Sequence, residues 1–353
     1  MTKEVNVVTF KVSVLGAGSW GTALSLVLAQ KNHEVVLWGR REEHIRKIKA
    51  TGENLRYLPG VKISKTTVLT DELEEALYQS HYIVIAVPSH AVRGLCKNIK
   101  PFIKEDSIVI SAAKGIETST LKRMTEIIKE ELDNSIDPKN IAVLSGPSHA
   151  EEVARNLPTT VVAAASKKNV AEAVQDLFIT ERFRVYTNPD VIGVELGGAL
   201  KNIIALGAGV ADGLGFGDNT KAALMTRGIA EITRLGIAMG AEPLTFAGLT
   251  GVGDLIVTCT SKYSRNRKAG IKLGQGKTLK QVYEEIHMVV EGIRTTKAAY
   301  ELQKKYNIEM PITTQTYKVL FENKQPLDAV NDLMTRVRTR EMEEVALQKN
   351  WNW

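Results

Sequence analysis

The sequence predicts a doubly wound parallel α/β sheet in an N-terminal domain, followed by an all-helical C-terminal domain. Three observations support this fold class. The chain has 353 residues, more than a single compact core usually holds, so we expect two domains. Short runs rich in Val and Ile alternate with helical periods through the first half. After about residue 189, strand-like alternation largely stops and helical periodicity dominates.

The strand candidates of the first half are nearly continuous in Val and Ile, as expected for strands that are covered on both faces. They lie at 11–15, 34–38, 67–69, 81–87, 107–112 and 141–144. Helical segments alternate with them at 21–31, 42–49, 72–79, 91–99 and 118–132, and two further strands at 159–165 and 184–187 flank a helix at 169–178. Such alternation builds a doubly wound parallel sheet.

The all-helical domain is predicted from 191 to 353, with helices at 192–210, 221–239, 279–285 and 295–305. The sequence Asn-Pro-Asp at 188–190 marks the junction, because a proline restricts the residue before it and commonly separates elements. We therefore expect domains at 1–190 and 191–353, without internal repeats or low-complexity linkers.

Composition excludes several classes of protein. Hydrophobic residues make up 44% of the chain and charged residues 24%, as in ordinary soluble globular proteins. Cys96 and Cys259 are far apart and show no CxxC spacing, which argues against a disulfide framework or a zinc site and fits a reducing, cytoplasmic location. The first residues lack the apolar core and small-residue cleavage site of a secretion signal. No uninterrupted apolar run approaches the ~20 residues that span a bilayer, so we expect no stable membrane insertion.

The net charge of +6 raises the question of an anionic partner. Lys and Arg are spread along the chain, and their densest cluster, 262–268, is short and interleaved with Ser264 and Asn266. This pattern favours a pocket for one phosphate over a track along a polymer. We therefore expect a small phosphorylated molecule as the partner, and not a nucleic acid.

A glycine-rich turn follows the first predicted strand. Residues 16–21 read Gly-Ala-Gly-Ser-Trp-Gly and lead directly into a predicted helix. In this pattern Gly16 makes the tight turn, Gly18 lets the backbone approach a pyrophosphate, and Gly21 lets helix and strand pack closely. The pyrophosphate then lies at a helix N-terminus, where free N–H groups and the helix dipole favour anions. The turn in this context predicts a Rossmann-like domain that binds a nicotinamide dinucleotide for hydride transfer.

The end of the second predicted strand bears on the choice of cofactor. A strict NAD site usually places an acid about 20 residues after the turn, where it accepts from the ribose 2′-hydroxyl. Here Gly39 is followed by Arg40 and Arg41, and acids appear only at Glu42 and Glu43. Two guanidinium groups suit a 2′-phosphate, so we predict a preference for NADP(H), with NAD(H) as a possible cofactor. Alternatively, the two arginines only begin a solvated helix.

Two predicted strand ends carry polar residues where open α/β sheets bind ligands. Lys114 follows the strand at 107–112, although on charge alone a lysine there is more often a surface residue. Gly146, Ser148 and His149 follow the strand at 141–144. Ser148 is a natural helix N-cap and needs no other role. His149 could act as a general base, but a lone turn histidine is usually structural or exposed, and we assign it no catalytic role.

The first helix of the second domain is unusual because it contains adjacent glycines, Gly197 and Gly198. Each glycine costs a helix about 1 kcal/mol relative to alanine, so something should approach closely there. Lys201 and Asn202 lie one turn further on. If that surface closes over a nicotinamide, Lys201 can donate a proton to a carbonyl oxygen, because a desolvated lysine has a lowered pKa.

Two later segments supply further polar groups. Asp254 could pair with and orient a catalytic ammonium group. Arg265 and the amide of Asn266 could clamp a phosphate dianion, because a guanidinium forms bidentate hydrogen bonds to phosphate oxygens. Together these groups describe a site for a small phosphorylated carbonyl compound.

The motifs GAGSWGTA, SAAKGIE, LSGPSHAEEV, ELGGALKNIIALGAG and GLTGVGDLIVTCTSKYSRNRKAG, in this order, resemble those of the soluble, bacterial-type NAD(P)-dependent glycerol-3-phosphate dehydrogenases. The resemblance extends from about residue 11 to about residue 340. It implies reversible reduction of dihydroxyacetone phosphate to sn-glycerol 3-phosphate, by a cytoplasmic, commonly dimeric enzyme that needs no metal and supplies glycerophospholipid synthesis. The segment 1–10 and the tail Trp351-Asn352-Trp353 lie outside the shared pattern, and no role is assigned to them.

The resemblance also implies roles for single residues. Lys201 corresponds to the family's general acid/base, and Lys114 to a lysine that contacts both cofactor and substrate. Implied substrate contacts are Gly146, Ser148, Asp254, Ser264, Arg265 and Asn266, to which we add Lys201, Lys114 and the adjacent Asn202. Implied cofactor contacts, besides the glycines of the turn and Lys114, are Ser19, Trp20, Arg40, Arg41, Ala150, Arg265, Val289 and Glu291. Many relatives have phenylalanine where His149 stands, a difference that leaves Gly146 and Ser148 in place.

Two alternatives remain. A two-domain dehydrogenase of a hydroxyacid or sugar acid also places a lysine on the first helix after the nucleotide domain, but its substrate needs a carboxylate site. A non-enzymatic module that senses the dinucleotide and contacts nucleic acid would need the glycine turn, but not Lys114, Lys201 and Asp254 together.

Overall fold

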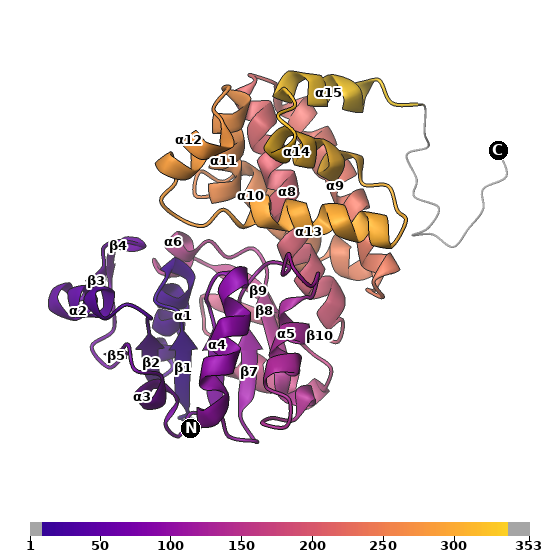
Figure 1. Cartoon of the computed structure of the whole chain (residues 1–353). Coiled ribbons are helices and arrows are strands. Elements are labelled where there is room, and N and C mark those ends of the chain that lie inside the picture. Colours follow the sequence, from indigo (N-terminus) through magenta and orange to yellow (C-terminus); the bar gives the residue numbers. More distant parts are fainter. Residues whose placement is uncertain (1–8, 338–353) are drawn as a thin grey trace.

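A computed structural model describes residues 9–337 of the chain, so the segments 1–8 and 338–353, including the tail Trp351–Trp353, lie outside the described residues. The N-terminal part forms an eight-stranded sheet with helices on both faces, and the C-terminal part is helical (Figure 1). The predicted fold class, a Rossmann-like doubly wound sheet followed by an all-helical region, is confirmed.

The sheet has the strand order β10-β9-β8-β7-β6-β1-β2-β5. Six of these strands, from β5 through β1 to β8, have the order and parallel pairing of a dinucleotide-binding sheet. The bounds of all eight strands lie within a few residues of those predicted: β1 (Lys11–Leu15), β2 (Glu34–Trp38), β5 (Val68–Thr70), β6 (Tyr82–Ile85), β7 (Ile108–Ser111), β8 (Ile141–Ser145), β9 (Thr159–Ala165) and β10 (Phe183–Asn188).

One pairing departs from the predicted parallel sheet, because β9 runs antiparallel to β8. The only helix between them, α6 (Ala150–Val153), has 4 residues. A helix of that length rises about 6 Å, whereas a parallel crossover must carry the chain back along a strand of about 17 Å. The chain therefore returns directly as an antiparallel neighbour, and β10 then pairs parallel with β9.

The two faces of the sheet are covered by different helices, because alternate strand residues point to opposite faces. Val12 and Val14 of β1 belong to the core shared with α1 (Ser19–Gln30), α2 (Glu42–Thr51) and α7 (Lys168–Phe178). Leu15 belongs to the core on the other face, with α3 (Leu73–Leu77), α4 (Val92–Ile99) and α5 (Met124–Glu131). Both cysteines are free thiols and buried, Cys96 in α4 and Cys259 in the helical region.

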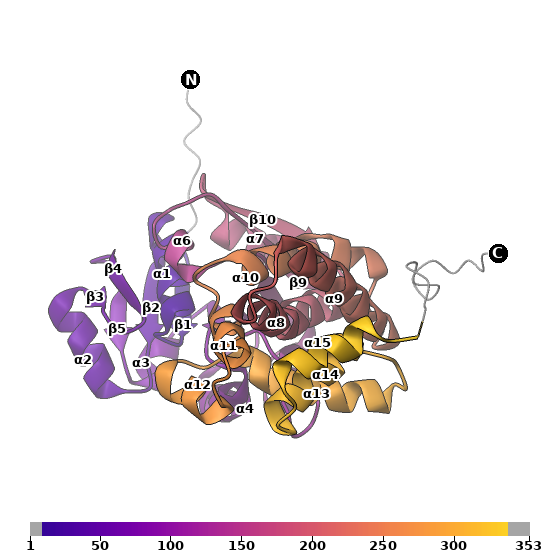
Figure 2. The ribbon, with the colours of Figure 1, turned by 90° about the horizontal axis from the view of Figure 1, so that it is seen from above.

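A two-stranded hairpin that was not predicted, β3 (Glu53–Asn54) with β4 (Leu58–Lys62), lies beside α2 at one end of the sheet (Figures 1 and 2). We call it the β3–β4 hairpin. Asn54 is completely buried, and its side-chain amide donates to the carbonyl of Ala17 (3.0 Å) and to Thr22 Oγ1 (2.8 Å). The hairpin is thereby attached to the glycine turn.

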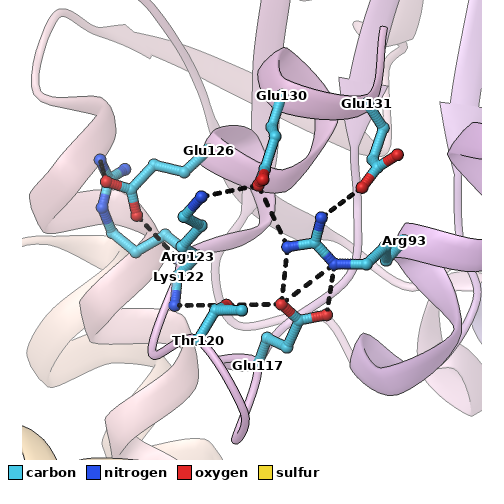
Figure 3. Close-up of polar contacts among 8 residues, drawn as sticks. All are labelled: Arg93, Glu117, Thr120, Lys122, Arg123, Glu126, Glu130 and Glu131. Atoms are coloured by element: carbon cyan, nitrogen blue, oxygen red, sulfur yellow. Dashed lines mark hydrogen bonds and ion pairs between the residues drawn. The ribbon is translucent and has the colours of Figure 1, made fainter.

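The predicted helix at 118–132 is wrong in its first residues, because α5 begins only at Met124. Residues 117–122 instead form a loop closed by a bridge between Ile116 and Arg123. Figure 3 shows what holds this loop: Arg93 of α4 donates to both carboxylate oxygens of Glu117 (2.8–3.2 Å) and to carboxylates of α5. We call this set the Arg93 network; its members are Arg93, Glu117, Lys122, Glu130 and Glu131.

The helical region is built around α8 (Val191–Gly213), whose residues from Gly193 to Leu206 are all buried. Length and composition alone would let α8 cross a membrane, but 83% of its apolar window lies inside the protein, as in a core helix. Around α8 lie α9 (Asp218–Ala238), α10 (Asp254–Thr260), α11 (Arg265–Gly274), α13 (Glu291–Lys305) and α14 (Pro311–Phe321), with α12 (Leu279–Glu285) and α15 (Pro326–Met334) further out (Figure 2).

Candidate active site

The glycine turn has the geometry of an anion-binding site. Gly16 has φ +130°, a conformation that L side chains rarely adopt, and a Cβ on Gly21 would lie 2.0 Å from the Gly16 carbonyl oxygen. Gly18 is the N-cap of the 12-residue helix α1, and no side chain caps this end. No heavy atom lies within 4 Å of the position that a Cβ on Gly18 would take.

The space above this turn fits a dinucleotide pyrophosphate. The first N–H groups of α1 have no partner within the helix, and the helix dipole favours an anion there. Ser19 and Trp20 begin the helix, and the indole Nε1 of Trp20 is buried without a hydrogen-bond partner among the described residues. A buried donor without an acceptor is costly, which is a second sign that this end of the sheet is built to receive a ligand.

Arg40 and Arg41 follow β2 at the same edge of the sheet, and both side chains are exposed. Arg41 is the N-cap residue of α2. Within residues 9–337, neither guanidinium forms an ion pair with a carboxylate, so both can bind an external anion.

Three charged side chains meet between the sheet and the helical region. Asp254, the first residue of α10, accepts a hydrogen bond from Lys201 of α8 (2.5 Å) and another from Lys114, which follows β7 (2.8 Å). We call this set the Lys–Asp–Lys centre. Lys201 also donates to Thr258 Oγ1 (2.6 Å). Both lysines are therefore held by one carboxylate, although they come from opposite sides of the site.

Burial sets the protonation of this centre. The Lys201 side chain is 6% exposed and burial lowers its pKa to about 8, an effect that Asp254 opposes and the charge of Lys114 assists. Burial acts to raise the pKa of Asp254, but the two ammonium groups outweigh it, so that pKa lies below its usual value. Asp254 is therefore ionised near neutral pH, while Lys201 can exchange a proton there.

The loop after β8 lies next to this centre. The carbonyl of Gly146 accepts from Lys114 Nζ (2.9 Å) and from Ser148 Oγ (2.9 Å). The residue at the N-cap of α6 is His149, not Ser148, and no side chain caps that helix. Burial and then the charge of Lys201 lower the pKa of His149 to about 4, so its imidazole is neutral at physiological pH.

The paired glycines of α8 explain how these elements approach one another. A Cβ on Gly197 would lie 2.5 Å from the carbonyl oxygen of Thr250, and one on Gly198 would lie 2.6 Å from Ser145 Oγ. The expectation of a close approach at this point is confirmed. Thr250 belongs to a turn with π-helical hydrogen bonding, Leu249–Gly253, which leads directly into Asp254. Such turns occur often at functional sites.

The predicted phosphate clamp is only partly open to a ligand. The Arg265 side chain is exposed and donates to the carbonyl of Val289 (3.1 Å). Asn266 is buried: its amide nitrogen donates to Asn202 Oδ1 (2.8 Å) and its oxygen accepts from the backbone of Gly292 (2.9 Å). One N–H of Asn266 therefore remains for a ligand. Ser264 caps α11 by accepting from the backbone of Arg267.

The remaining predicted cofactor residues lie at separate points around the site. Ala150 begins α6 and packs into the core beneath α1. Glu291, at the start of α13, accepts from the backbone N–H (3.0 Å) and hydroxyl (2.6 Å) of Ser89, which follows β6. This carboxylate joins the helical region to the sheet.

Sequence reasoning missed two polar residues of this region, Thr258 and Ser89. Thr258 lies four residues after Asp254, a spacing that places both side chains on the same side of α10. This spacing could have predicted Thr258 as a residue of the site. Ser89 follows a buried strand, but nothing local distinguishes it from an ordinary loop serine.

Comparisons with known proteins agree with this geometry. Two family models match the chain: the NAD-dependent glycerol-3-phosphate dehydrogenase N-terminus over residues 11–171, and its C-terminus over residues 190–331. A "Glycerol-3-phosphate dehydrogenase [NAD(P)+]" of Pelotomaculum thermopropionicum is 59% identical over 337 residues, which cover 96% of each chain. A protein of the same name from Bacillus velezensis is 57% identical, over 95% of this chain and 97% of its own.

A solved structure shows the same relationship. The crystal structure of glycerol-3-phosphate dehydrogenase from Coxiella burnetii superposes with a TM-score of 0.89 at 40% identity, covering 93% of this chain and 99% of its own. Matches of this length and identity show common descent across both the sheet and the helical region. The chain therefore belongs to the family of NAD-dependent glycerol-3-phosphate dehydrogenases.

Proposed function

We propose that this protein reversibly reduces dihydroxyacetone phosphate to sn-glycerol 3-phosphate with a nicotinamide dinucleotide. The observation that carries the proposal is the Lys–Asp–Lys centre, in which a buried lysine with a pKa of about 8 lies at the carboxyl ends of the strands. A carbonyl that receives a hydride must also receive a proton, and a lysine of this pKa can supply it near neutral pH.

When bound, the nicotinamide supplies the hydride to the carbonyl carbon. Lys201 donates its proton to the carbonyl oxygen as the alkoxide forms, and takes it back in the reverse direction. Asp254 keeps the Lys201 ammonium in position and stabilises its charge. Lys114, whose ammonium group donates to the Gly146 carbonyl and to the Asp254 carboxylate, also donates to the hydroxyketone.

Substrate binding is assigned to groups on both sides of the centre. Arg265 and the free N–H of Asn266 bind the phosphate of the substrate, and a guanidinium gives such a contact both charge and direction. Gly146, Ser148, Asn202 and Ser264 complete the polar surroundings. Arg265 also donates to the carbonyl of Val289, two residues before Glu291, so the phosphate clamp lies next to the proposed cofactor contacts.

For the cofactor, we propose a preference for NADPH over NADH. Arg40 and Arg41 stand where a strict NAD site usually carries an acid, and neither is neutralised by a carboxylate within the described residues. The pyrophosphate is assigned to Gly16, Gly18 and Gly21 with Ser19 and Trp20, and Ala150 to the adjoining wall.

The wider setting is proposed from the family resemblance. We assign a dinucleotide-binding domain to 1–190 and a substrate domain to 191–353, a homodimer in the cytoplasm, and a supply of glycerol 3-phosphate for phospholipid synthesis. We assign the net charge of +6 to attraction of the anionic cofactor and substrate, and not to nucleic-acid binding.

A direct assay tests this function. Purified protein should oxidise NADPH when dihydroxyacetone phosphate is added, with a lower KM than for NADH, and should show no turnover with a panel of 2-ketoacids. Turnover of a ketoacid in place of dihydroxyacetone phosphate would contradict the proposed substrate. Equal KM values for the two cofactors would contradict the proposed preference alone.

A further inference from the structure

The β3–β4 hairpin places a third guanidinium group at the edge of the sheet where Arg40 and Arg41 follow β2. Arg56 lies at the turn of this hairpin, between the strands β3 and β4, and is exposed. Its guanidinium carbon lies 5.3 Å from the centre of the Tyr57 ring, within cation–π distance. Neither its hairpin nor its charge was predicted to contribute to cofactor binding.

The hairpin and α2 are both attached to the glycine turn, because each has a side chain that donates to the carbonyl of Ala17 in that turn. The carbonyl of Ala17 accepts from the amide of Asn54 (3.0 Å) in β3. It also lies 3.2 Å from Nε2 of His44 in α2, and this nitrogen carries the proton because a carbonyl only accepts. The turn, α2 and the hairpin are therefore joined by hydrogen bonds, and Figures 1 and 2 show α2 and the hairpin side by side at one edge of the sheet.

His44 shows that cationic groups face this point from two elements. Its ring lies edge-on to Tyr57, with ring centres 5.2 Å apart. Burial lowers the pKa of His44, and the charges of Arg56, Arg41 and Lys47 lower it further, against the hydrogen bond to Ala17. Arg41 and Arg56 thus act on the same imidazole, one from α2 and the other from the hairpin.

The positive charge at this point is only partly balanced: the hydrogen bond from Lys47 lowers the pKa of Glu43, and the charge of Arg56 contributes to that shift. Lys47 is paired with Glu43 (2.6 Å), and Lys62 of the hairpin with Glu53 (2.9 Å). Over residues 9–337, no carboxylate lies within ion-pair distance of Arg56, nor of the two arginines that follow β2. Arg41 and Arg56, which both act on the imidazole of His44 and have no paired carboxylate, repel one another, and a bound dianion would reduce that repulsion.

We propose that Arg56 is a further specificity-determining residue, which binds a phosphate on the ribose 2′ oxygen of an adenine dinucleotide together with Arg40 and Arg41. The inference rests on the proposed function, because it requires a 2′-phosphorylated cofactor. A phosphate offers several acceptor oxygens to three guanidinium groups, whereas a 2′-hydroxyl carries no charge and gains little from a third cation. Arg56 therefore discriminates between the two cofactors more than it strengthens both.

Binding isotherms of NADPH and NADH, measured by titration calorimetry on the full-length protein, test this inference. Arg56→Gln removes the charge and keeps most of the side-chain length. It should raise the Kd for NADPH about tenfold, the loss of one charge-assisted contact, and leave the Kd for NADH unchanged. Arg56→Lys should give an intermediate Kd for NADPH, because an ammonium group is a point charge without the planar fork.

Lys65→Gln is the matched control, because Lys65 is exposed in the loop after β4 and its loss changes the net charge equally. It should leave the ratio of the two Kd values unchanged. If wild-type protein prefers NADPH and Arg56→Gln keeps that preference, the inference about Arg56 is wrong while the cofactor preference stands. If the wild-type protein binds NADPH and NADH with equal Kd, both the inference about Arg56 and the proposed cofactor preference are wrong. An equal effect of Lys65→Gln would show a general loss of positive field and would also overturn the inference. The melting temperature and the turnover with NADH establish that each variant is folded.

Discussion

At the scale of single residues, one buried carboxylate, that of Asp254, holds both lysines of the candidate site. Asp254 is 1% exposed and would be costly to bury alone, yet two ammonium groups neutralise it and help to keep it ionised. The same arrangement makes Lys201 less basic than a solvated lysine. One carboxylate thus positions the proposed proton donor, Lys201, while burial lowers the pKa of that lysine.

Replacement of Lys201 by methionine tests the proton transfer. The apolar side chain fills a similar volume but carries no proton, so kcat for reduction should fall by about 10³-fold, in the range of a lost general acid. The variant should still bind NADPH, because among residues 9–337 the Lys201 ammonium group bonds only to Asp254 and Thr258. Steady-state kinetics and a cofactor titration measure the two effects, and near-normal turnover would exclude Lys201 as the acid.

The pH profile tests the environment of the same lysine. The proposed mechanism requires protonated Lys201 for reduction, so the rate of reduction should fall as pH rises past about 8, and the rate of glycerol 3-phosphate oxidation should rise over the same interval. Thr258→Val removes an oxygen that accepts from the ammonium group, which lowers the pKa of Lys201 further. The upper limb of the reduction profile should therefore move to lower pH. A profile that stays in place would show that Thr258 serves packing alone.

At the scale of elements, the sequence predicts the helices and strands that have a clear hydrophobic periodicity. It does not predict the segments that are held by contacts between residues far apart in the sequence. β1, β2 and β9 have the predicted bounds, and α8 extends its predicted range by a few residues at its ends. The β3–β4 hairpin and the loop at 117–122 were not predicted. Asn54 stabilises the hairpin by bonding to Ala17, and Arg93 stabilises the loop by bonding to Glu117, and neither partner is near in sequence. The same limit applies to the site, where Thr258 and Ser89 gain their roles from residues on other elements.

The Arg93 network gives a stability prediction for these elements (Figure 3). Arg93→Met leaves the carboxylates of Glu117, Glu130 and Glu131 close together, with Lys122 as their nearest paired cation. The pairs are partly exposed, so the free energy of unfolding should fall by about 1–3 kcal/mol at pH 7, less than for a fully buried pair. Urea denaturation measures the difference.

The same network predicts how that difference depends on pH. The hydrogen bond from Arg93 holds the pKa of Glu117 below its ordinary value of 4.5. The contribution of the Arg93–Glu117 pair to the free energy of unfolding is therefore complete above pH 4.5. It is lost as pH falls through the lowered pKa of Glu117, because the folded state then binds the proton that the unfolded state already holds. The difference in the free energy of unfolding between wild type and Arg93→Met should decrease from pH 7 to pH 3.5. A constant gap would mean that packing, and not charge, stabilises the loop.

At the scale of the whole molecule, the sheet and the helical region share buried contacts. Val194 of α8 belongs to the same apolar cluster as Val143 and Val162 of the sheet. Glu195 of α8, also buried, accepts from the backbone (2.8 Å) and hydroxyl (2.6 Å) of Thr125 at the start of α5. The Lys–Asp–Lys centre adds a third link. The two regions are therefore not independent in their stability.

This coupling predicts a single unfolding transition. Scanning calorimetry at neutral pH should show one peak, with calorimetric and van't Hoff enthalpies equal, because unfolding of either region exposes Val194 and leaves Glu195 without its partners. Saturating NADPH should move that one peak to higher temperature by mass action. Two resolved peaks, of which only one responds to NADPH, would show that the regions unfold separately.

The position of α8 also has a consequence for folding during synthesis. A nascent chain emerges from its N-terminus, so β8 and β9 are complete before α8 has been made. Until α8 arrives, the side chains that Val194 covers in the finished protein face water: Val143, Val162 and Ala164. The nascent chain from which β8 and β9 have emerged, but α8 has not, therefore carries an open apolar strand face, and it is the species that chaperones should bind and that should aggregate first.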